Sequence, residues 1–130
     1  MTMTAERVQQ VRFVEPLPGF ADDGTFTFSP IDPDDVLFSL RSVQHPDIRF
    51  VLASPGAFFP DYAPDVATLL AGVLGTDDVE LLVMLTIGTG LADATANLRA
   101  PIVIARSTGR AVQVILEDAL LPMRAPLLGL

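Results

Sequence analysis

The side chains that most often carry catalysis are scarce in this chain, which has a single histidine and no cysteine. Nucleophilic catalysis by Ser or Thr needs an adjacent base. His45 precedes Pro46 in a polar loop, the setting of an ordinary surface residue. Without cysteine there is no thiol nucleophile, no disulfide and no thiolate metal site. A single histidine also argues against histidine-based zinc chemistry.

Carboxylates are the other candidates for acid–base or metal chemistry, and they come in adjacent pairs. The pairs are Asp22-Asp23, Asp34-Asp35, Asp77-Asp78 and Glu117-Asp118. Each pair stands at a turn or a strand end, beside residues that form turns, so we interpret them as solvated turn residues. The stretch 32–35 lacks the ligand spacing of a calcium loop. We therefore expect no catalytic residues, no metal site and no cofactor.

A loop with Gly88 and Gly90 is a further candidate for ligand binding. No lysine follows it and no helix is predicted to open after it, so it does not match a phosphate-binding loop. An enzyme that uses this loop is the third of our functional hypotheses, after the two given below.

The charge of the chain points to a protein partner. The net charge is −8, and all eight basic residues are arginine. Such a surface repels the phosphates of nucleic acids and anionic membranes. It would attract a basic partner, which could itself bind nucleic acid. The alternative is that the acidity only keeps a hydrophobic chain soluble.

Length and hydrophobicity predict one folded domain. The chain has 130 residues, of which 50% are hydrophobic, so disorder is not expected. We expect a single domain over residues 1–130, with an ordered core over about residues 8–121. No apolar run reaches the roughly 18 residues of a membrane span. The N-terminus lacks the apolar stretch of a signal peptide, so the expected location is the cytoplasm.

Short alternating or apolar runs separated by turn residues predict strands, the first four of them at a spacing of roughly ten residues. These runs are 8–13, 25–28, 36–42, 48–53, 79–87, 102–104 and 110–116. Residues 65–74 predict a helix, because Asp65 can cap it and Gly75 can end it. The pattern predicts a mainly β fold, a small antiparallel β-barrel-like domain with one short helix. The expected core includes Val83, Leu85, Ile102, Ile104 and Val114.

Residues 95–104 join two of the predicted strands. Ile102-Val103-Ile104 is a β-branched run typical of a buried strand. Pro101, which lacks an N–H donor, is tolerated at the start of a strand but not within one. Asn97 could hold the adjoining turn by bonding to backbone groups. Contact with a partner is the alternative for Asn97.

Two further segments have less regular patterns. Residues 58–62 form an aromatic cluster beside a proline, which we interpret as core or lid packing. An exposed aromatic patch for a partner is the alternative. The C-terminal tail contains Pro122 and Pro126, and we expect it to be loosely held.

Several motifs occur in a fixed order over about residues 13–126. They are Leu17-Pro18-Gly19-Phe20, Leu40-Arg41-Ser42, Phe50-Val51 with Pro55, Phe59-Pro60-Asp61-Tyr62, Thr95-Ala96-Asn97-Leu98-Arg99-Ala100-Pro101-Ile102-Val103-Ile104 and Gln113-Val114-Ile115-Leu116. The last two are the most specific. By these motifs the chain resembles FliW, the bacterial flagellar assembly factor family. It departs from the family at Arg41, where Gln is common, and at Ala105, where Asn is common.

The resemblance implies a small antiparallel β-barrel-like domain that acts as a non-enzymatic regulator with two protein partners. One is flagellin, and the other is CsrA, a dimeric translational repressor that binds RNA. In that scheme, FliW held by flagellin leaves CsrA free to repress flagellin translation. After flagellin is exported, FliW binds CsrA away from its RNA-binding surface and relieves repression. Direct binding to nucleic acid or to a membrane is not expected.

The residues expected to contact partners are Asn97, Arg99, Tyr62, Asp77 and Asp78. The alternative function is a small-molecule-binding β-barrel protein, with the ligand in an apolar mouth. Binding to purified flagellin and CsrA would distinguish the two functions.

Overall fold

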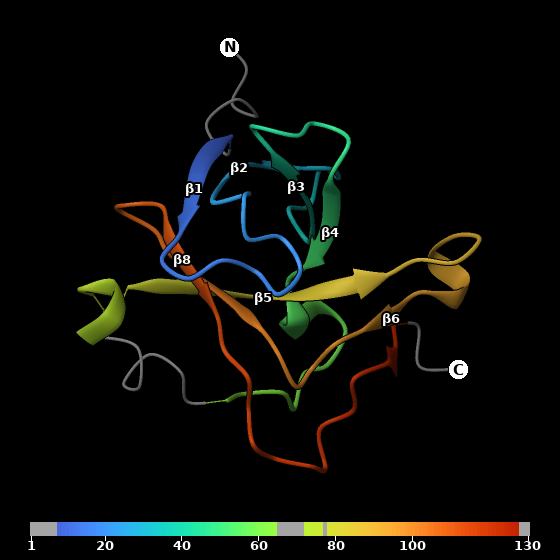
Figure 1. The fold of residues 1–130 in the computed structure, drawn as a ribbon. Coiled ribbons are helices and arrows are strands. Elements are labelled where there is room, and N and C mark those ends of the chain that lie inside the picture. The colour runs from blue at the N-terminus through green and yellow to red at the C-terminus, as the bar shows by residue number, and fades with distance from the viewer. Residues whose placement is uncertain (1–7, 65–71, 77, 128–130) are drawn as a thin grey trace.

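The computed structural model describes residues 8–64, 72–76 and 78–127, which form a mainly β domain (Figure 1). Two single turns of 3-10 helix, η2 (Pro55–Ala57) and η3 (Leu91–Asp93), lie between strands. The strands are β1 (Gln9–Phe13), β2 (Thr25–Pro30), β3 (Leu37–Ser42), β4 (Arg49–Ala53), β5 (Val79–Thr86), β6 (Thr95–Ala96), β7 (Ile102–Ala105), β8 (Arg110–Gln113) and β9 (Ala125–Pro126).

Within the described residues, seven strands close into a barrel in the order β4-β3-β2-β1-β8-β7-β5, with β5 paired back to β4. The neighbouring strands of this described ring are antiparallel, except that β1 and β8 run parallel. A ring with an odd number of strands cannot alternate direction all the way round, so at least one parallel pair is required. The predicted β-barrel is confirmed, with its parallel pair at the β1–β8 closure.

Strand β5 belongs both to the barrel and to a smaller C-terminal assembly. Its residues 79–82 pair with β7, and residues 83–85 pair with β4. Near its end, Leu85 and Thr86 pair with β6, which in turn pairs with β9. Figure 1 shows β5 crossing most of the width of the molecule beneath β1–β4. β5 therefore connects the barrel to the segment that contains the candidate site.

The core lies on both faces of β5, as its nearly continuous apolar run indicates. Leu82 packs inside the barrel, whereas Val83 and Leu85 belong to a second cluster on the opposite face. Ile102 and Ile104 of β7 also face the barrel interior.

The predicted burial of Val83, Leu85, Ile102 and Ile104 is confirmed. The prediction for Val114 is wrong in degree, because this residue is only partly buried against a third cluster. Val114 lies just past the end of β8, where its N–H donates to the Pro101 carbonyl at 2.9 Å.

The hairpin between β7 and β8 closes at Gly109. Gly109 has φ +77°, and its carbonyl accepts the Arg12 N–H at 2.9 Å. A Cβ at this position would lie 2.5 Å from the Gln10 carbonyl oxygen. Glycine is therefore needed for the turn and for the close approach to β1.

The helix predicted over residues 65–74 lies mostly outside the described residues. Residues 72–74 are helical, and Leu74 is buried beside Val103 in the third cluster. Gly75 has φ +78°, the conformation expected just after a helix C-terminus.

The expectation of a loosely held tail is wrong. Strand β9 pairs with β6 in the register Ala96↔Ala125, and the Leu127 N–H donates to the Ala94 carbonyl at 3.0 Å. Ala125 and Leu127 are buried. β9 lies beyond the 8–121 range expected for the ordered core. A two-residue strand is too short to show a hydrophobic period, so the sequence pattern could not predict it.

Candidate partner-binding surface

Asn97 builds the turn by which the chain leaves β6. Its N–H donates to the Met84 carbonyl at 3.0 Å, and its Oδ1 accepts the Arg99 N–H at 3.1 Å. This side-chain bond two residues along the chain is an Asx turn. The predicted turn-holding role of Asn97 is therefore confirmed. Pro101 is buried immediately before β7, where a missing N–H is tolerated.

Arg99 holds the C-terminal segment against this turn. Its Nε donates to the Leu121 carbonyl and its Nη2 to the Ala119 carbonyl, each at 3.0 Å. The Leu98 N–H also donates to the Pro122 carbonyl at 3.1 Å. Residues 119–122 are thus tied to the turn by both backbone and side-chain bonds.

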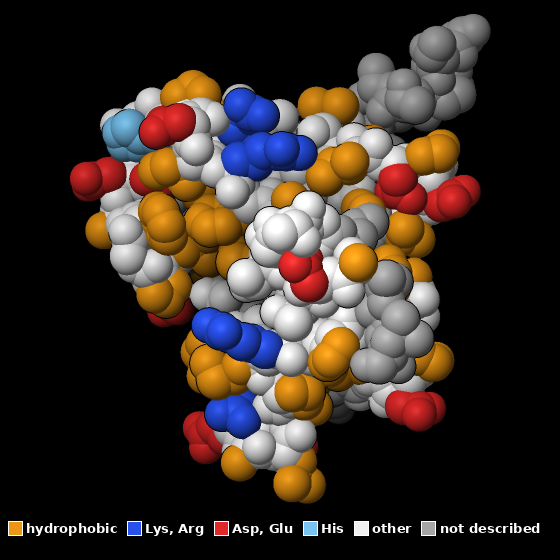
Figure 2. Space-filling model, turned by 90° about the vertical axis from the view of Figure 1, so that its right-hand side faces the viewer, with side chains coloured by type: hydrophobic (Ala, Val, Ile, Leu, Met, Phe, Trp, Pro, Cys, Tyr) orange, Lys and Arg blue, Asp and Glu red, His pale blue; other side chains and the backbone are white. Residues whose placement is uncertain are grey.

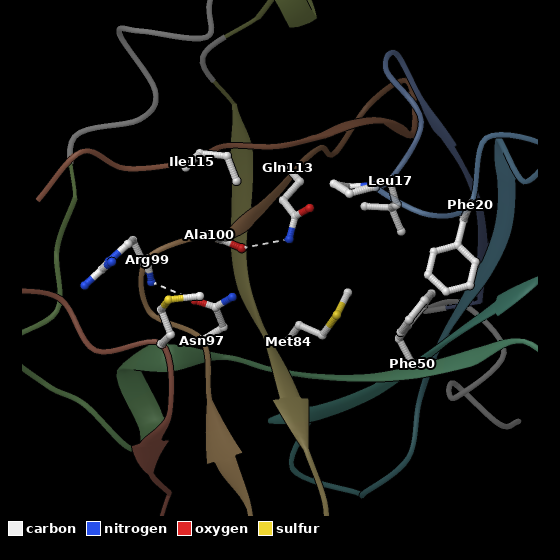
Figure 3. Close-up of a pocket in the computed structure, with 11 residues that line it drawn as sticks. Leu17, Phe20, Phe50, Met84, Asn97, Arg99, Ala100, Gln113 and Ile115 are labelled. Carbon is white, nitrogen blue, oxygen red and sulfur yellow. Dashed lines mark hydrogen bonds between the residues drawn. The ribbon is translucent and has the colours of Figure 1, made fainter. Parts of the chain in front are cut away.

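A cavity of about 320 Å³ opens beside the turn, at one end of the barrel (Figure 3). Phe20 and Phe50 form part of its wall and pack edge to face, with ring centroids 5.2 Å apart. The lining is mostly apolar, as in sites that bind ligands or protein side chains. The lining residues are Leu17, Pro18, Phe20, Phe50, Met84, Asn97, Arg99, Ala100, Gln113, Ile115 and Met123.

Two side-chain amides stand in the wall of this cavity. Gln113 Nε2 donates to the Ala100 carbonyl at 3.3 Å, and Asn97 Oδ1 accepts from Arg99. Because a carbonyl accepts and an N–H donates, these bonds fix which way each amide points. In Figure 3 the other halves, Asn97 Nδ2 and Gln113 Oε1, face the cavity. Within the described part of the chain, neither atom has a hydrogen-bond partner.

Tyr62 contacts the same segment at Leu98. Its hydroxyl donates to the Leu98 carbonyl at 2.7 Å, and burial raises the pKa of Tyr62 to about 12. Phe58, Phe59 and Tyr62 pack against the second hydrophobic cluster. This packing confirms the core interpretation of the aromatic segment.

A groove of about 350 Å³ runs beside Tyr62 and combines apolar residues with three carboxylates. Its lining residues are Asp61, Tyr62, Ala63, Pro64, Leu116, Glu117, Asp118 and Leu121. We call it the acidic groove. The groove is lined by carboxylates, whereas the one charged residue among the lining residues of the cavity beside Phe20 and Phe50 is Arg99.

Of the predicted acidic pair at residues 77–78, only Asp78 is described, and it is not part of this arrangement. Asp77 lies outside the described residues. Asp78 is exposed just before β5, and its Oδ1 lies 3.8 Å from Arg106 Nε. Met84, whose carbonyl binds Asn97, is six residues further along the chain, or roughly 20 Å in a strand. The structure therefore brings Asn97, Arg99 and Tyr62 together around Leu98 and places Asp78 apart.

A polar cluster that the sequence did not indicate joins Asp23, Ser42 and His45. Asp23 Oδ1 accepts a hydrogen bond from the Ser42 hydroxyl and lies 2.7 Å from His45 Nδ1. Asp23 is buried, so its interpretation as a solvated turn residue is wrong. The side chains of Ser42 and His45 both contact the Asp23 carboxylate, and the bond between the two residues runs from the His45 backbone N–H to Ser42 Oγ at 3.0 Å, not from the imidazole. The cluster is therefore a clamp between loops rather than a nucleophile–base pair.

The hydrogen bond from Ser42, followed by that from His45, lowers the pKa of Asp23. The hydrogen bond to Asp23 raises the pKa of His45. The register Phe26↔Ser42 brings the cluster together across the β2–β3 hairpin. No local sequence signal links positions so far apart in the chain.

The glycine loop at residues 88–90 is occupied by its own carboxylate. Asp93 accepts the N–H groups of Thr89 and Gly90 at 3.1–3.2 Å, and these bonds lower the pKa of Asp93. The amides that a bound phosphate would need are thus already used. Over residues 8–64, 72–76 and 78–127, no group of three or more His, Asp or Glu is placed to hold a metal ion. None of the helices described there is long and apolar enough to cross a membrane.

The charge is unevenly spread over the surface. Figure 2 shows a face on which arginines and hydrophobic side chains lie near one another, with most carboxylates toward its edge. A net charge of −8 therefore does not make every face of the described structure acidic. Different faces suit partners of different charge.

Comparisons with known proteins agree on one family. A sequence model of FliW protein matches residues 1–127. The flagellar assembly factor FliW of Bacillus velezensis is 39% identical over 114 residues, covering 85% of this chain and 80% of that protein. The FliW of Bacillus subtilis is 32% identical over 130 residues, covering 98% and 91%. A crystal structure of the flagellar assembly factor FliW superposes with a TM-score of 0.79 at 32% identity, covering 98% of this chain and 89% of that one.

Proposed function

The chain belongs to the FliW family of flagellar assembly factors, and from this premise we propose that it is a non-enzymatic regulator that binds flagellin and antagonises the translational repressor CsrA. The match to the family over residues 1–127 is the observation that carries the proposal. The relatives are named for assembly of an organelle, not for a reaction.

In the proposed cycle, flagellin and CsrA compete for this protein. While flagellin accumulates, the protein is held by flagellin and CsrA represses flagellin translation. After flagellin is exported, the free protein binds CsrA away from its RNA-binding surface. We place this exchange in the cytoplasm, where translation takes place.

The acidic groove supports the proposed contact with a basic RNA-binding protein. Three carboxylates line this groove together with apolar residues such as Leu121. Carboxylates attract a basic partner during encounter, while apolar contacts slow its dissociation. Glu117 and Asp118 are exposed, so they are accessible to such a partner.

Small-molecule binding is the second candidate function, and the cavity at the barrel end favours it. Its volume of about 320 Å³ is near the lower end of the roughly 300–1,000 Å³ found for ligand pockets. In this alternative the ligand would be mostly apolar, with a polar group near Asn97 and Gln113.

Titration calorimetry with purified flagellin and purified CsrA tests the proposed function. We expect binding of each protein, and loss of CsrA binding when the protein is first saturated with flagellin. An unrelated basic protein of similar size is the control for nonspecific attraction to acidic residues. If neither flagellin nor CsrA binds at about 10⁻⁵ M protein, the regulator function is rejected and small-molecule binding becomes the leading candidate.

A further inference from the structure

We propose that the cavity at the barrel end is the docking site for an apolar segment of flagellin, which inserts a side chain and pairs its backbone with Asn97 and Gln113. The inference rests on the proposed function and deepens it, because it assigns one of the two partners to one of two surfaces. Three observations support it: the side-chain amides of Asn97 and Gln113 that face the cavity, the exposed residues Ile115 and Met123 at its mouth, and the charge of its lining residues.

The two amide groups that have no partner among the described residues match the backbone of a peptide. Asn97 Nδ2 is a hydrogen-bond donor and Gln113 Oε1 is an acceptor, and both face the cavity (Figure 3). The opposite ends of the two amides are held by the Arg99 N–H and the Ala100 carbonyl. Both amides are therefore fixed before a partner arrives. One fixed donor and one fixed acceptor are the complement of a peptide carbonyl and a peptide N–H.

The rim of the cavity favours a protein segment over a small molecule. Ile115 and Met123 line the cavity, yet 64% and 57% of their surface is exposed. A small ligand inside the cavity would leave much of this rim in water. A peptide segment that crosses the mouth would cover Ile115 and Met123 while its side chain enters the apolar interior.

The charge of the lining separates the two partners. Although the chain has a net charge of −8, the cavity lining contains no carboxylate and one cation, Arg99. Because Arg99 repels lysine and arginine, the cavity does not suit the basic repressor. An uncharged or mildly acidic apolar segment fits it better. The acidic groove has the opposite charge and suits CsrA. Arg99 of the cavity donates to the carbonyl of Leu121, which lines the groove, so the two surfaces adjoin and two protein partners would exclude each other.

A small blocked amino acid tests the site independently of either protein partner. The probe is N-acetyl-leucine N-methylamide, which has an apolar side chain and peptide carbonyl and N–H groups. Nitrogen-15 NMR of the full chain, with the probe at about millimolar concentration, should shift the side-chain amide signals of Asn97 and Gln113. Asn97 is the only asparagine of the chain, so its signal is readily assigned. If these amides do not shift, or if the shifts lie elsewhere, the site is rejected.

Matched variants test the site with flagellin. Ile115→Asp places a charge at the rim, and Leu120→Asp makes the same change at a 90% exposed position outside the cavity lining. We expect Ile115→Asp to weaken flagellin binding at least about tenfold and Leu120→Asp to leave it unchanged. CsrA binding should be similar for both variants. Equal flagellin binding by Ile115→Asp and the unmodified protein would overturn the assignment.

A second pair of variants tests the amide donor. Asn97→Asp keeps the oxygen that accepts the Arg99 N–H but replaces the donor that faces the cavity. Gln44→Glu adds the same charge at an exposed loop position. We expect about tenfold weaker flagellin binding for Asn97→Asp, from the lost bond and the unpaired carboxylate, and no change for Gln44→Glu. If the unmodified protein binds flagellin and all variants bind equally, the docking site fails while the proposed function stands. If it binds neither protein, the proposed function fails, and the NMR titration still decides whether the cavity binds a peptide group.

Discussion

Nδ1 of His45 lies 2.7 Å from Oδ1 of the buried Asp23, and this contact ties the loop before β2 to the loop after β3. The same carboxylate accepts the Ser42 hydroxyl, and Ser42 Oγ accepts the His45 N–H at 3.0 Å. Asp47 and Asp22 are near enough to favour protonated His45 further. Protonation of one imidazole therefore controls the charge state of the clamp between these two loops.

The clamp predicts a pH dependence of stability. The pKa of His45 is raised above 6.5, so its contribution is complete below pH 6.5 and is lost as the pH rises through the raised pKa. The pKa of Asp23 is lowered from 3.8, so its contribution is present above pH 3.8 and is lost as the pH falls through the lowered pKa. The charged pair should stabilise the fold most between pH 3.8 and 6.5.

Urea denaturation of the unmodified protein and of His45→Gln, across the pH range, measures this effect. The difference in unfolding free energy should be largest near about pH 5.5 and should shrink toward about pH 9. A difference that is the same at both pH values would show that protonation of His45 does not contribute.

Replacement of Ile104 by Ala should destabilise the barrel. Ile104 is 2% exposed in β7 and faces the barrel interior. Loss of its buried methyl and methylene groups should cost roughly 2–5 kcal/mol, measured by chemical denaturation. Ile31→Ala is the matched control, because Ile31 is 46% exposed and its truncation should change stability by about 0.5 kcal/mol or less. A similar cost for both variants would contradict the observed burial.

Replacement of Asn97 separates its structural role from its proposed contact role. Asn97→Ala removes the acceptor of the Arg99 N–H, so it should lower the unfolding free energy by roughly 1–3 kcal/mol. Asn97→Asp keeps an acceptor at the same position and should be close to the unmodified protein in stability. Unchanged stability of Asn97→Ala together with weaker partner binding would instead make partner contact its main role.

Replacement of Arg99 should loosen the C-terminal segment. Arg99→Lys cannot reproduce the two bonds to the carbonyls of Leu121 and Ala119. We expect a loss of roughly 1–3 kcal/mol and faster hydrogen exchange at the Leu98 amide, which bonds to Pro122. Arg106→Lys is the control, since Arg106 makes an exposed pair at 3.8 Å, worth about 0–1 kcal/mol. Equal exchange at Leu98 in both variants would show that Arg99 does not hold the segment.

Much of the barrel could be predicted because its strands have local signals. Alternation marked β2, and the apolar runs marked β5 and β7, since hydrophobic period reflects which face is buried. The parallel β1–β8 closure depends on how distant strands meet in the ring, so no local pattern indicates it. Strand β9 is two residues long and is specified by its pairing with β6, not by its own sequence.

The candidate site could be predicted only in part, for a similar reason. Asn97 stood out because an asparagine before a β-branched strand suggests a turn. Gln113 gave no such signal, since it faces the cavity only after β8 has paired with β7 in the register Ile102↔Gln113. Asp22 and Asp23 are adjacent aspartates in the same turn, and the sequence does not distinguish them. The folded β2–β3 hairpin buries Asp23, which contacts Ser42 and His45.

The acidic groove predicts that the two proposed partners respond differently to salt. A contact between the carboxylates of the groove and a basic protein should weaken clearly as salt rises, because exposed charges are screened beyond about 10 Å at 0.1 M. A flagellin contact in the apolar cavity should depend on salt only modestly. Association and dissociation rates of each partner, measured at two salt concentrations, would show whether salt weakens CsrA binding more than flagellin binding.

Neutralising Glu117 and Asp118 should locate the basic partner. Glu117→Gln with Asp118→Asn removes two charges from the groove, and Asn keeps the oxygen that accepts the Leu120 N–H. We expect slower association with CsrA and a smaller change in its dissociation rate. Asp34→Asn with Asp35→Asn makes the same charge change at exposed positions in another loop, and asparagine tolerates the positive φ of Asp35. If both double variants slow association equally, net charge and not the groove steers the encounter.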